Sequence, residues 1–194
     1  MYEFITGDIV EKTPTYIILE TGNVGYFINI SLFTYSLLPD QKPCQLFIHQ
    51  IVREDAHILF GFINKEEREV FRQLISVSGV GANTARLILS SLSPVEIQQA
   101  INEGNVLELQ KIKGIGAKSA QRIIVDLKGK ISMASEMDHL FPSKSNTIME
   151  ESLSALVNLG FAKKTVEKVL EQILKGGNDQ ITVEELIKEA LKKL

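Results

Sequence analysis

The sequence predicts a multi-domain α+β protein in which a small β-barrel precedes two helical parts. Three observations support this fold class. Residues 1–64 contain short β-prone runs separated by turn signals, residues 65–131 show apolar residues at the three-to-four spacing of helices, and residues 147–194 carry the apolar faces of three short helices. Residues 132–146 contain several serines, a proline and no strong periodicity, so we expect a flexible linker there.

Five β-prone runs make up most of the first part. The clearest of them, Val24–Ile30, has an apolar residue at every second position, the period of a half-buried strand. The other runs are Phe4–Val10, Tyr16–Glu20, Leu46–Arg53 and Ile58–Phe62. Five short strands favour a small closed barrel such as an OB-fold, with a small sandwich as the alternative. Ser31–Leu38, between the third and fourth runs, is expected to form one or two helical turns.

The middle part changes to a helical pattern at Lys65. Ser93 and Pro94 fit an N-cap followed by proline at the first helical position, which predicts a helix through Ile101. Helical character persists to about Lys130.

The last part is divided into three helices by two capping-box patterns and two glycine breaks. These signals are Thr147 with Glu150, Thr182 with Glu185, Gly160, and the run Gly176–Asp179. A bundle of this size is small but feasible.

The composition excludes several classes of protein. The chain has 194 residues, of which 44% are hydrophobic and 23% charged, and no run approaches the 18 apolar residues of a membrane-spanning helix. The N-terminus lacks the basic flank and apolar run of a signal peptide, so a cytoplasmic location is expected. Cys44 is the only cysteine, which rules out an internal disulfide and a cysteine-based zinc or iron–sulfur centre. We expect neither a cofactor nor a metal.

The net charge of −3 conceals an uneven distribution along the chain. Residues 1–64 carry a net −4, whereas residues 65–132 carry a net +3. Between Lys111 and Lys130 there are six basic residues and one acidic residue, Asp126. A charge run of this kind often marks no more than a solvated helix face, so the residues between the charges decide its meaning.

An internal repeat with a spacing of 35 residues lies within residues 65–132, the part of the chain with a net positive charge. Leu74–Leu89 and Leu109–Ile124 share eight positions in kind, among them the Gly-hydrophobic-Gly sequences Gly79-Val80-Gly81 and Gly114-Ile115-Gly116. A ninth position keeps a hydroxyl, since Thr84 corresponds to Ser119. The pattern predicts, twice, a helix, a tight glycine turn and a second helix.

Such a turn is suited to binding phosphate. Glycines allow positive φ angles and leave no side chain between the backbone and a ligand. The turn therefore exposes amide N–H groups at a helix N-terminus, where free donors and the helix dipole attract anions. Backbone contacts to phosphate carry little information about bases, so the predicted binding is to nucleic acid of any sequence. The alternative is a pair of glycine turns that bind nothing, and the presence of two copies in register argues against it.

The paired motifs resemble tandem helix–hairpin–helix elements, and the whole chain resembles the RuvA family of Holliday junction branch migration subunits. Local matches strengthen the resemblance: Val52–Ala56 fits the family's hairpin tip, Gly61-Phe62 and Asn64-Lys65 fit the strand end and the domain crossing, and Ile123–Lys128 fits the helix after the second hairpin. The resemblance implies an OB-fold barrel at 1–64, a tandem helix–hairpin–helix domain at 65–131, and a UBA-like three-helix domain at 147–194 that binds a motor.

The resemblance also implies a function. It implies a non-catalytic subunit that binds four-way junction DNA during recombination and repair, as one or two homotetramers, together with a RuvB-type hexameric ATPase and a RuvC-type resolvase. The residues expected to bind DNA are Gly79, Val80, Gly81, Asn83, Thr84, Arg86, Gly114, Ile115, Gly116, Lys118, Ser119 and Arg122.

One position departs from the family's pattern. The family commonly has a basic residue in the first hairpin where this chain has Asn83. Arg86 lies one helical turn later, and its side chain is a candidate replacement.

Glu54 and Asp55 lie between two β-prone runs and are expected at a hairpin turn. An acidic turn is usually only solvated, and a metal-dependent nuclease site would need further carboxylates or histidines, such as His49 and His57, in a geometry that no motif fixes. The resemblance implies instead an acidic pin, which repels phosphates at the centre of a junction.

The chain lacks the GxxxxGK[ST] loop of a nucleotide hydrolase, so an external ATPase must supply the work. The resemblance places the motor contact in the last part, and we select Leu156, Leu159, Gly160 and Phe161, although such residues also fill small cores.

The residues leave two other functions open. A helix–hairpin–helix repair glycosylase or lyase would use an activated lysine, for which Lys113 and Lys118 are weak candidates. A single-strand-binding OB protein would carry basic and aromatic residues on its barrel, whereas residues 1–64 are acidic.

Overall fold

The computed structural model describes residues 1–39, 43–131, 144–174 and 181–194. The chain divides into two compact units, residues 1–138 and 139–194, and each is described by itself. None of the helices in the described ranges is long and apolar enough to cross a membrane.

The first unit begins with a closed barrel of five strands in the order β1–β2–β3–β5–β4. Strands β3 and β5 pair in parallel, and every other pair is antiparallel. The strands are β1 (Phe4–Lys12), β2 (Tyr16–Thr21), β3 (Val24–Asn29), β4 (Cys44–Val52) and β5 (His57–Phe62). This confirms the predicted five-stranded barrel, and the sandwich alternative is wrong. Closure removes the exposed strand edges that so short a sheet would otherwise present.

Alternating side chains fill the barrel because successive residues of a strand point to opposite faces. Ile17, Leu19, Ile28, Leu46 and Ile48 are fully buried. The space for them depends on one glycine, since a Cβ on Gly61 would lie 2.5 Å from the Ile28 side chain.

A buried carboxylate joins the barrel to the first long helix. Helix α1 (Leu32–Leu37) begins at the N-cap Ser31, as expected for Ser31–Leu38, and α2 (Lys65–Ser76) begins after Asn64. Glu67 of α2 is fully buried and accepts hydrogen bonds from the hydroxyls of Ser31 and Thr34. Burial raises the pKa of Glu67 above its ordinary value, although these hydrogen bonds act in the opposite direction.

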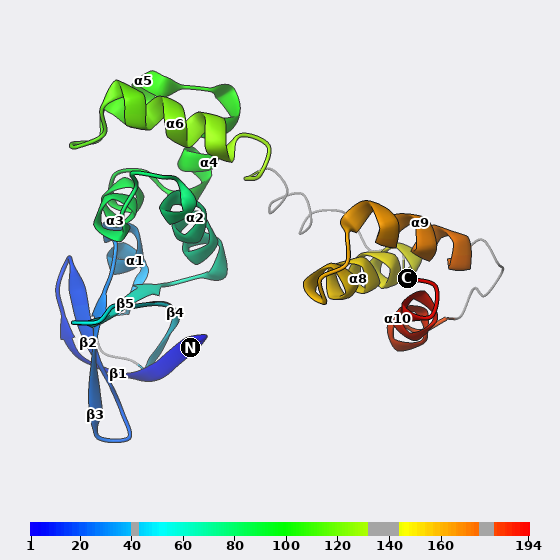
Figure 1. The fold of residues 1–194 in the computed structure, drawn as a ribbon. Helices are drawn as coiled ribbons and strands as arrows, with labels where there is room; N and C mark the ends of the chain where they lie inside the picture. Colours follow the sequence, from blue (N-terminus) through cyan, green and yellow to red (C-terminus); the bar gives the residue numbers. More distant parts are fainter. Residues whose placement is uncertain (40–42, 132–143, 175–180) are drawn as a thin grey trace. The chain divides into compact units, whose positions relative to one another are not determined.

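Five helices follow the barrel in the described part of the first unit: α2, α3 (Ala82–Ser91), α4 (Pro94–Glu103), α5 (Val106–Gln110) and α6 (Ala117–Leu127). Figure 1 shows α2 and α3 between the barrel and the helices α4 to α6. Phe71 of α2 packs against Phe60 and Phe62 of β5, so the barrel end and the helices share one apolar core. The predicted N-cap Ser93 is confirmed and forms a capping box with Glu96.

The second unit is a bundle of the helices α8 (Lys144–Asn158), α9 (Lys163–Leu174) and α10 (Val183–Leu191) around its own apolar core. The predicted capping box of Thr182 and Glu185 is confirmed. The one at Thr147 is wrong, because α8 begins at Lys144 and Thr147 therefore lies within the helix and not at its N-cap.

Part of the expected linker therefore belongs to this bundle. Residues 144–146 are helical, whereas residues 132–143 and the predicted break at Gly176–Asp179 lie outside the described residues. The domain boundaries at 64 and 131 stay predictions.

Candidate nucleic-acid interface

The two copies of the repeat form two hairpins with the same backbone. One hairpin joins α2 to α3, and the other joins α5 to α6. The first glycine of each turn has a positive φ, 89° at Gly79 and 90° at Gly114. The second glycine is the N-cap of the following helix, with φ/ψ of −85°/168° at Gly81 and −82°/168° at Gly116. The repeat in sequence is therefore a repeat in conformation.

The internal hydrogen bonds of the turns also correspond. The Val80 N–H donates to the carbonyl oxygen of Val77 at 3.0 Å, and the Ile115 N–H donates to that of Ile112 at 3.0 Å. Val80 and Ile115 are both buried, so the central apolar residue anchors each turn in the core. These two side chains thus support the turns from within, while the glycines beside them are exposed.

The helices that follow the glycine turns begin without a side-chain cap. Neither α3 nor α6 has a side-chain hydrogen bond at its N-cap, so Thr84 and Ser119 do not cap them. The helices α1, α2, α4, α5 and α10 each have one, supplied by Ser31, Asn64, Ser93, Asn105 and Thr182. The first-turn amides of α3 and α6 are therefore left for an external acceptor, at the positive ends of two helix dipoles.

The four glycines of the two turns have two different roles. A Cβ added at any of the four would meet no other atom within 4 Å. Gly79 and Gly114 are required by their positive φ, which other residues adopt only at a cost. Gly81 and Gly116 have ordinary φ angles, so the fold does not require glycine there. An open approach to the backbone is what a phosphate ligand needs.

The side chains near the second hairpin are consistent with its positive charge. Lys118 is exposed in the first turn of α6. Arg122 is also exposed and faces Asp126 at 3.8 Å between Nε and Oδ2. An exposed pair at this distance is weak and leaves the guanidinium accessible to a stronger acceptor.

The first hairpin has a different electrostatic environment. Asn83, which corresponds to Lys118, is exposed and uncharged. Arg86 turns to the barrel, where its Nη1 donates to the Thr15 carbonyl at 3.1 Å and to the Asn29 Oδ1 at 2.9 Å. Burial lowers the pKa of Arg86, and these acceptors lie 71 and 57 residues away in sequence. Arg86 thus connects α3 to the barrel and is not a free cation beside the glycine turn.

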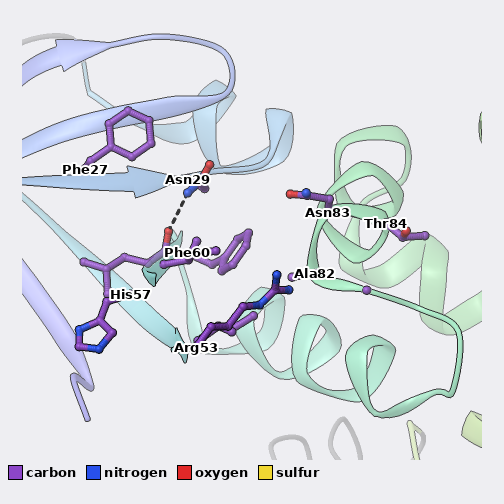
Figure 2. Close-up of a pocket in the computed structure, with 12 residues that line it drawn as sticks. Phe27, Asn29, Arg53, His57, Phe60, Ala82, Asn83 and Thr84 are labelled. Carbon is purple, nitrogen blue, oxygen red and sulfur yellow. Dashed lines mark hydrogen bonds between the residues drawn. The ribbon is translucent and has the colours of Figure 1, made fainter. Parts of the chain in front are cut away.

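A cleft of about 520 Å³ separates the first hairpin from the barrel (Figure 2). One wall is the start of α3, from Gly81 to Thr84, and the other is formed by residues of β3, β4 and β5 together with Arg53. In Figure 2 the side chain of Arg53 extends from the end of β4 toward Ala82. No sequence pattern predicted this cation, because the approach of Arg53 to α3 depends on how the barrel packs on the helices.

The acidic pair lies at the tip of the β4–β5 hairpin, as expected. Val52 pairs with His57, and the Arg53 N–H donates to the Ala56 carbonyl at 2.8 Å, which closes a turn. Glu54 and Asp55 are its exposed central residues, and neither makes an ion pair or side-chain hydrogen bond with another described residue. Their charges therefore face solvent.

No three His, Cys, Asp or Glu side chains in the described ranges are grouped to hold a metal ion. His49 packs its ring against Phe71 at 5.4 Å, and burial lowers its pKa.

A C-terminal capping motif explains three of the four residues selected in the last part. Gly160 has a φ of 101°, its N–H donates to the Val157 carbonyl at 2.9 Å, and the Phe161 N–H donates to the Leu156 carbonyl at 3.2 Å. This is the Schellman pattern that ends α8, and Phe161 packs against the bundle core to which Leu156 belongs. Leu156 is fully buried, whereas the side chain of Leu159 is 64% exposed and has no comparable internal role.

Comparisons with known proteins cover the whole chain. The family models that match are "RuvA N terminal domain" at residues 1–61, "SAM-like Helix-hairpin-helix tandem" at 71–129 and "RuvA, C-terminal domain" at 147–194. Relatives from Christiangramia forsetii, Flavobacterium psychrophilum and Azobacteroides pseudotrichonymphae are 51%, 50% and 47% identical, each over 100% of both chains. Each is named "Holliday junction branch migration complex subunit RuvA". These matches do not favour the glycosylase alternative.

Proposed function

The chain belongs to the RuvA family, and on that basis we propose that it is the non-catalytic subunit that binds Holliday junctions in a branch migration complex. The observation that carries the proposal is the pair of hairpins with matching backbones, each ending in an uncapped helix N-terminus. Two such sites on one unit suit two phosphates of a duplex arm. A cytoplasmic location belongs to the same proposal.

In this function the hairpins bind the phosphate backbone of the duplex arms and do not discriminate between base sequences. The backbone amides after Gly81 and Gly116 bind phosphate oxygens, while Lys118 and Arg122 add charge on the second hairpin. Each phosphate neutralised by a basic side chain contributes about 0.9 to the slope of log affinity against log salt on duplex DNA. Backbone amides are uncharged and do not release counterions in this way, so the slope reports only the basic side chains that contact phosphates.

We assign the tip of the β4–β5 hairpin to the centre of the junction. In a homotetramer four tips bring eight carboxylates around the crossover, and two facing homotetramers bring four tips from each side. At about 10 Å a single pair of unit charges in water is worth roughly 0.4 kcal/mol, so the repulsion depends on their number and on confinement. The repulsion would keep the exchanging strands apart while the hairpins hold the arms.

The chain needs a motor to move the junction. We propose a RuvB-type hexameric ATPase, bound through the exposed Leu159 at the end of α8, and a RuvC-type resolvase that acts on the same complex. Burial of a leucine side chain in an interface contributes about 1.5–3 kcal/mol, which suits one anchor of a reversible contact.

Junction binding tests the proposal directly. The protein should bind a four-way junction at least about tenfold more tightly than a linear duplex of the same sequences in a gel-shift titration, and sizing of the complex should give four or eight protomers. Equal affinity for both DNAs would contradict it. Cleavage of a damaged duplex without ATP or partner would favour the glycosylase alternative instead.

A further inference from the structure

The first hairpin lacks a cation of its own at the position where the second hairpin has one. The repeat aligns Asn83 with Lys118, and Arg86 donates to acceptors in the barrel. Yet α3 and α6 begin with the same backbone and the same free amides. If both hairpins bind phosphate, the charge for the first one must come from another element.

Arg53 has the position and the freedom to supply it. It follows β4 directly and lines the same cleft as Gly81 and Ala82. Its side chain is exposed, and it makes no ion pair or side-chain hydrogen bond within the described part of the chain. In Figure 2 the guanidinium group extends toward Ala82, the first residue of α3.

The electrostatics of this arrangement favour an anion in the cleft. A cation beside a helix N-terminus faces the positive end of the dipole, which is unfavourable by itself. An oxyanion between the two would accept hydrogen bonds from both, and a guanidinium group is suited to the geometry of a phosphate. A Cβ at Gly81 would meet no protein atom within 4 Å, so the approach to the amides is open.

We propose that Arg53 and the first-turn amides of α3 hold one DNA phosphate together, so that the barrel supplies the cation that the first hairpin lacks. This inference rests on the proposed junction binding. It adds a specific consequence, because Arg53 immediately precedes Glu54 and Asp55. The strand held at this phosphate lies next to the repulsive tip, and the same turn therefore attracts the arm and repels the crossover.

Replacing Arg53 tests the attraction. The variant Arg53→Gln should weaken binding to a four-way junction by about tenfold and lower the slope of log affinity against log salt by about one. Arg53→Lys keeps the charge but loses the fork of donors, and it should recover only part of the affinity. Lys163→Gln, which removes a cation from α9, is the control and should bind like the wild type.

A double-mutant cycle tests whether the phosphate is shared. Gly81→Ala and Gly116→Ala place the same methyl group at equivalent N-caps with ordinary φ angles. The double variant of Arg53→Gln and Gly81→Ala should have a Kd that differs by about threefold or more from the value expected if the two single effects were independent. The double variant of Arg53→Gln and Gly116→Ala should match that expectation within about twofold.

Two results would overturn the inference while leaving junction binding intact. One is a wild-type affinity and salt slope for Arg53→Gln. The other is additivity in both cycles, which would make Arg53 a diffuse charge without a ligand in common with α3. A wild-type protein with no preference for junctions would instead contradict the proposed function itself, and circular dichroism of every variant excludes misfolding as the cause of lost binding.

Discussion

Glycine has two distinct purposes within each hairpin turn. At Gly79 and Gly114 it permits a backbone conformation with positive φ that other residues adopt only under strain. At Gly81 and Gly116 the backbone is ordinary, and the missing side chain leaves the amides open to solvent. Substitution of the first glycine of a turn should therefore mainly lower stability, whereas substitution of the second should mainly weaken binding.

Alanine substitutions measure this separation. Gly79→Ala should lower the free energy of unfolding by about 1–2 kcal/mol, because it forces a Cβ into the left-handed region. Gly81→Ala should change stability by less than about 1 kcal/mol but weaken junction binding several-fold, since its methyl group projects into the approach to the amides. Urea denaturation and gel-shift titration of both variants check this. Equal effects of the two changes on both measurements would show that the glycines have one common purpose.

The buried carboxyl group of Glu67 leads to a prediction about pH. Its pKa is raised in the folded state by burial, so the folded protein binds a proton more tightly than the unfolded chain. The stability that this proton contributes is complete below the unfolded pKa near 4.5 and is lost as pH rises through the folded pKa. Glu67→Gln abolishes this titration. The unfolding free energy of the wild type minus that of the Glu67→Gln variant should therefore fall as pH rises above 4.5.

Urea denaturation at a series of pH values from 4.5 upward checks this prediction. Glu66→Gln, which removes an exposed carboxylate from the same turn of α2, is the matched control. A difference between wild type and Glu67→Gln that stays constant or grows with pH would contradict the raised pKa.

The exposed pair at the hairpin tip is predicted to repel DNA. Glu54→Gln combined with Asp55→Asn should leave folding unchanged, because neither side chain has an internal partner among the described residues. Removing two charges per protomer, each worth about 0.4 kcal/mol, should tighten DNA binding at least roughly fourfold, lower the preference for junctions and change the migration rate. Titrations with four-way and linear DNA measure it. The paired change Glu184→Gln and Glu189→Gln in α10 controls for net charge, and unchanged binding and migration would reject the pin.

At the scale of elements, the sequence predicts those features that depend on neighbouring residues. The barrel strands, the repeated glycine turns and the caps at Ser93 and Thr182 are encoded within a few residues of each other and are confirmed. The direction of Arg86 depends on acceptors 57 and 71 residues away, and the approach of Arg53 to α3 depends on the packing of β4 against the helices. No local pattern carries such information.

The end of α8 shows the same limit on a smaller scale. The sequence identifies Leu156, Leu159, Gly160 and Phe161 as one group, because they are close in the chain. The Schellman hydrogen bonds divide that group into a structural set and one exposed side chain. Only these hydrogen bonds distinguish Leu159, whose side chain is available to a partner, from its neighbours in the chain.

Substitution of this leucine tests the selection. Leu159→Ser should leave the bundle folded and weaken stimulation of a RuvB-type ATPase by about tenfold or more, consistent with the loss of one buried leucine from an interface. Leu156→Ala should instead destabilise the bundle by about 2–5 kcal/mol, because the side chain fills its core. Leu191→Ser, at an exposed leucine of α10, is the control for surface polarity changes. If Leu159→Ser and Leu191→Ser stimulate the motor as the wild type does, the motor contact lies elsewhere.

At the scale of the whole molecule, negative and positive charge are divided between different parts of the chain. The barrel carries the negative excess and the hairpins carry the positive one, within a single compact unit. A chain with a net charge of −3 is thereby compatible with DNA binding, because in the proposed function attraction acts along the arms and repulsion acts at the tip. The second unit has no net charge between residues 151 and 194 and has its own core, which suits a separate task.

Removal of that unit tests the division of labour. Since α8 begins at Lys144, the deletion should take residues 144–194 and leave no part of the helix behind. The remaining chain keeps the barrel and hairpin cores intact, and it should bind four-way junctions within about twofold of the full-length affinity, because every hairpin residue is retained. Stimulation of the ATPase should be lost, since the unit that carries Leu159 is absent. Motor stimulation that survives the deletion would place the contact on the first unit, and a large loss of junction binding would show that the bundle takes part in holding DNA.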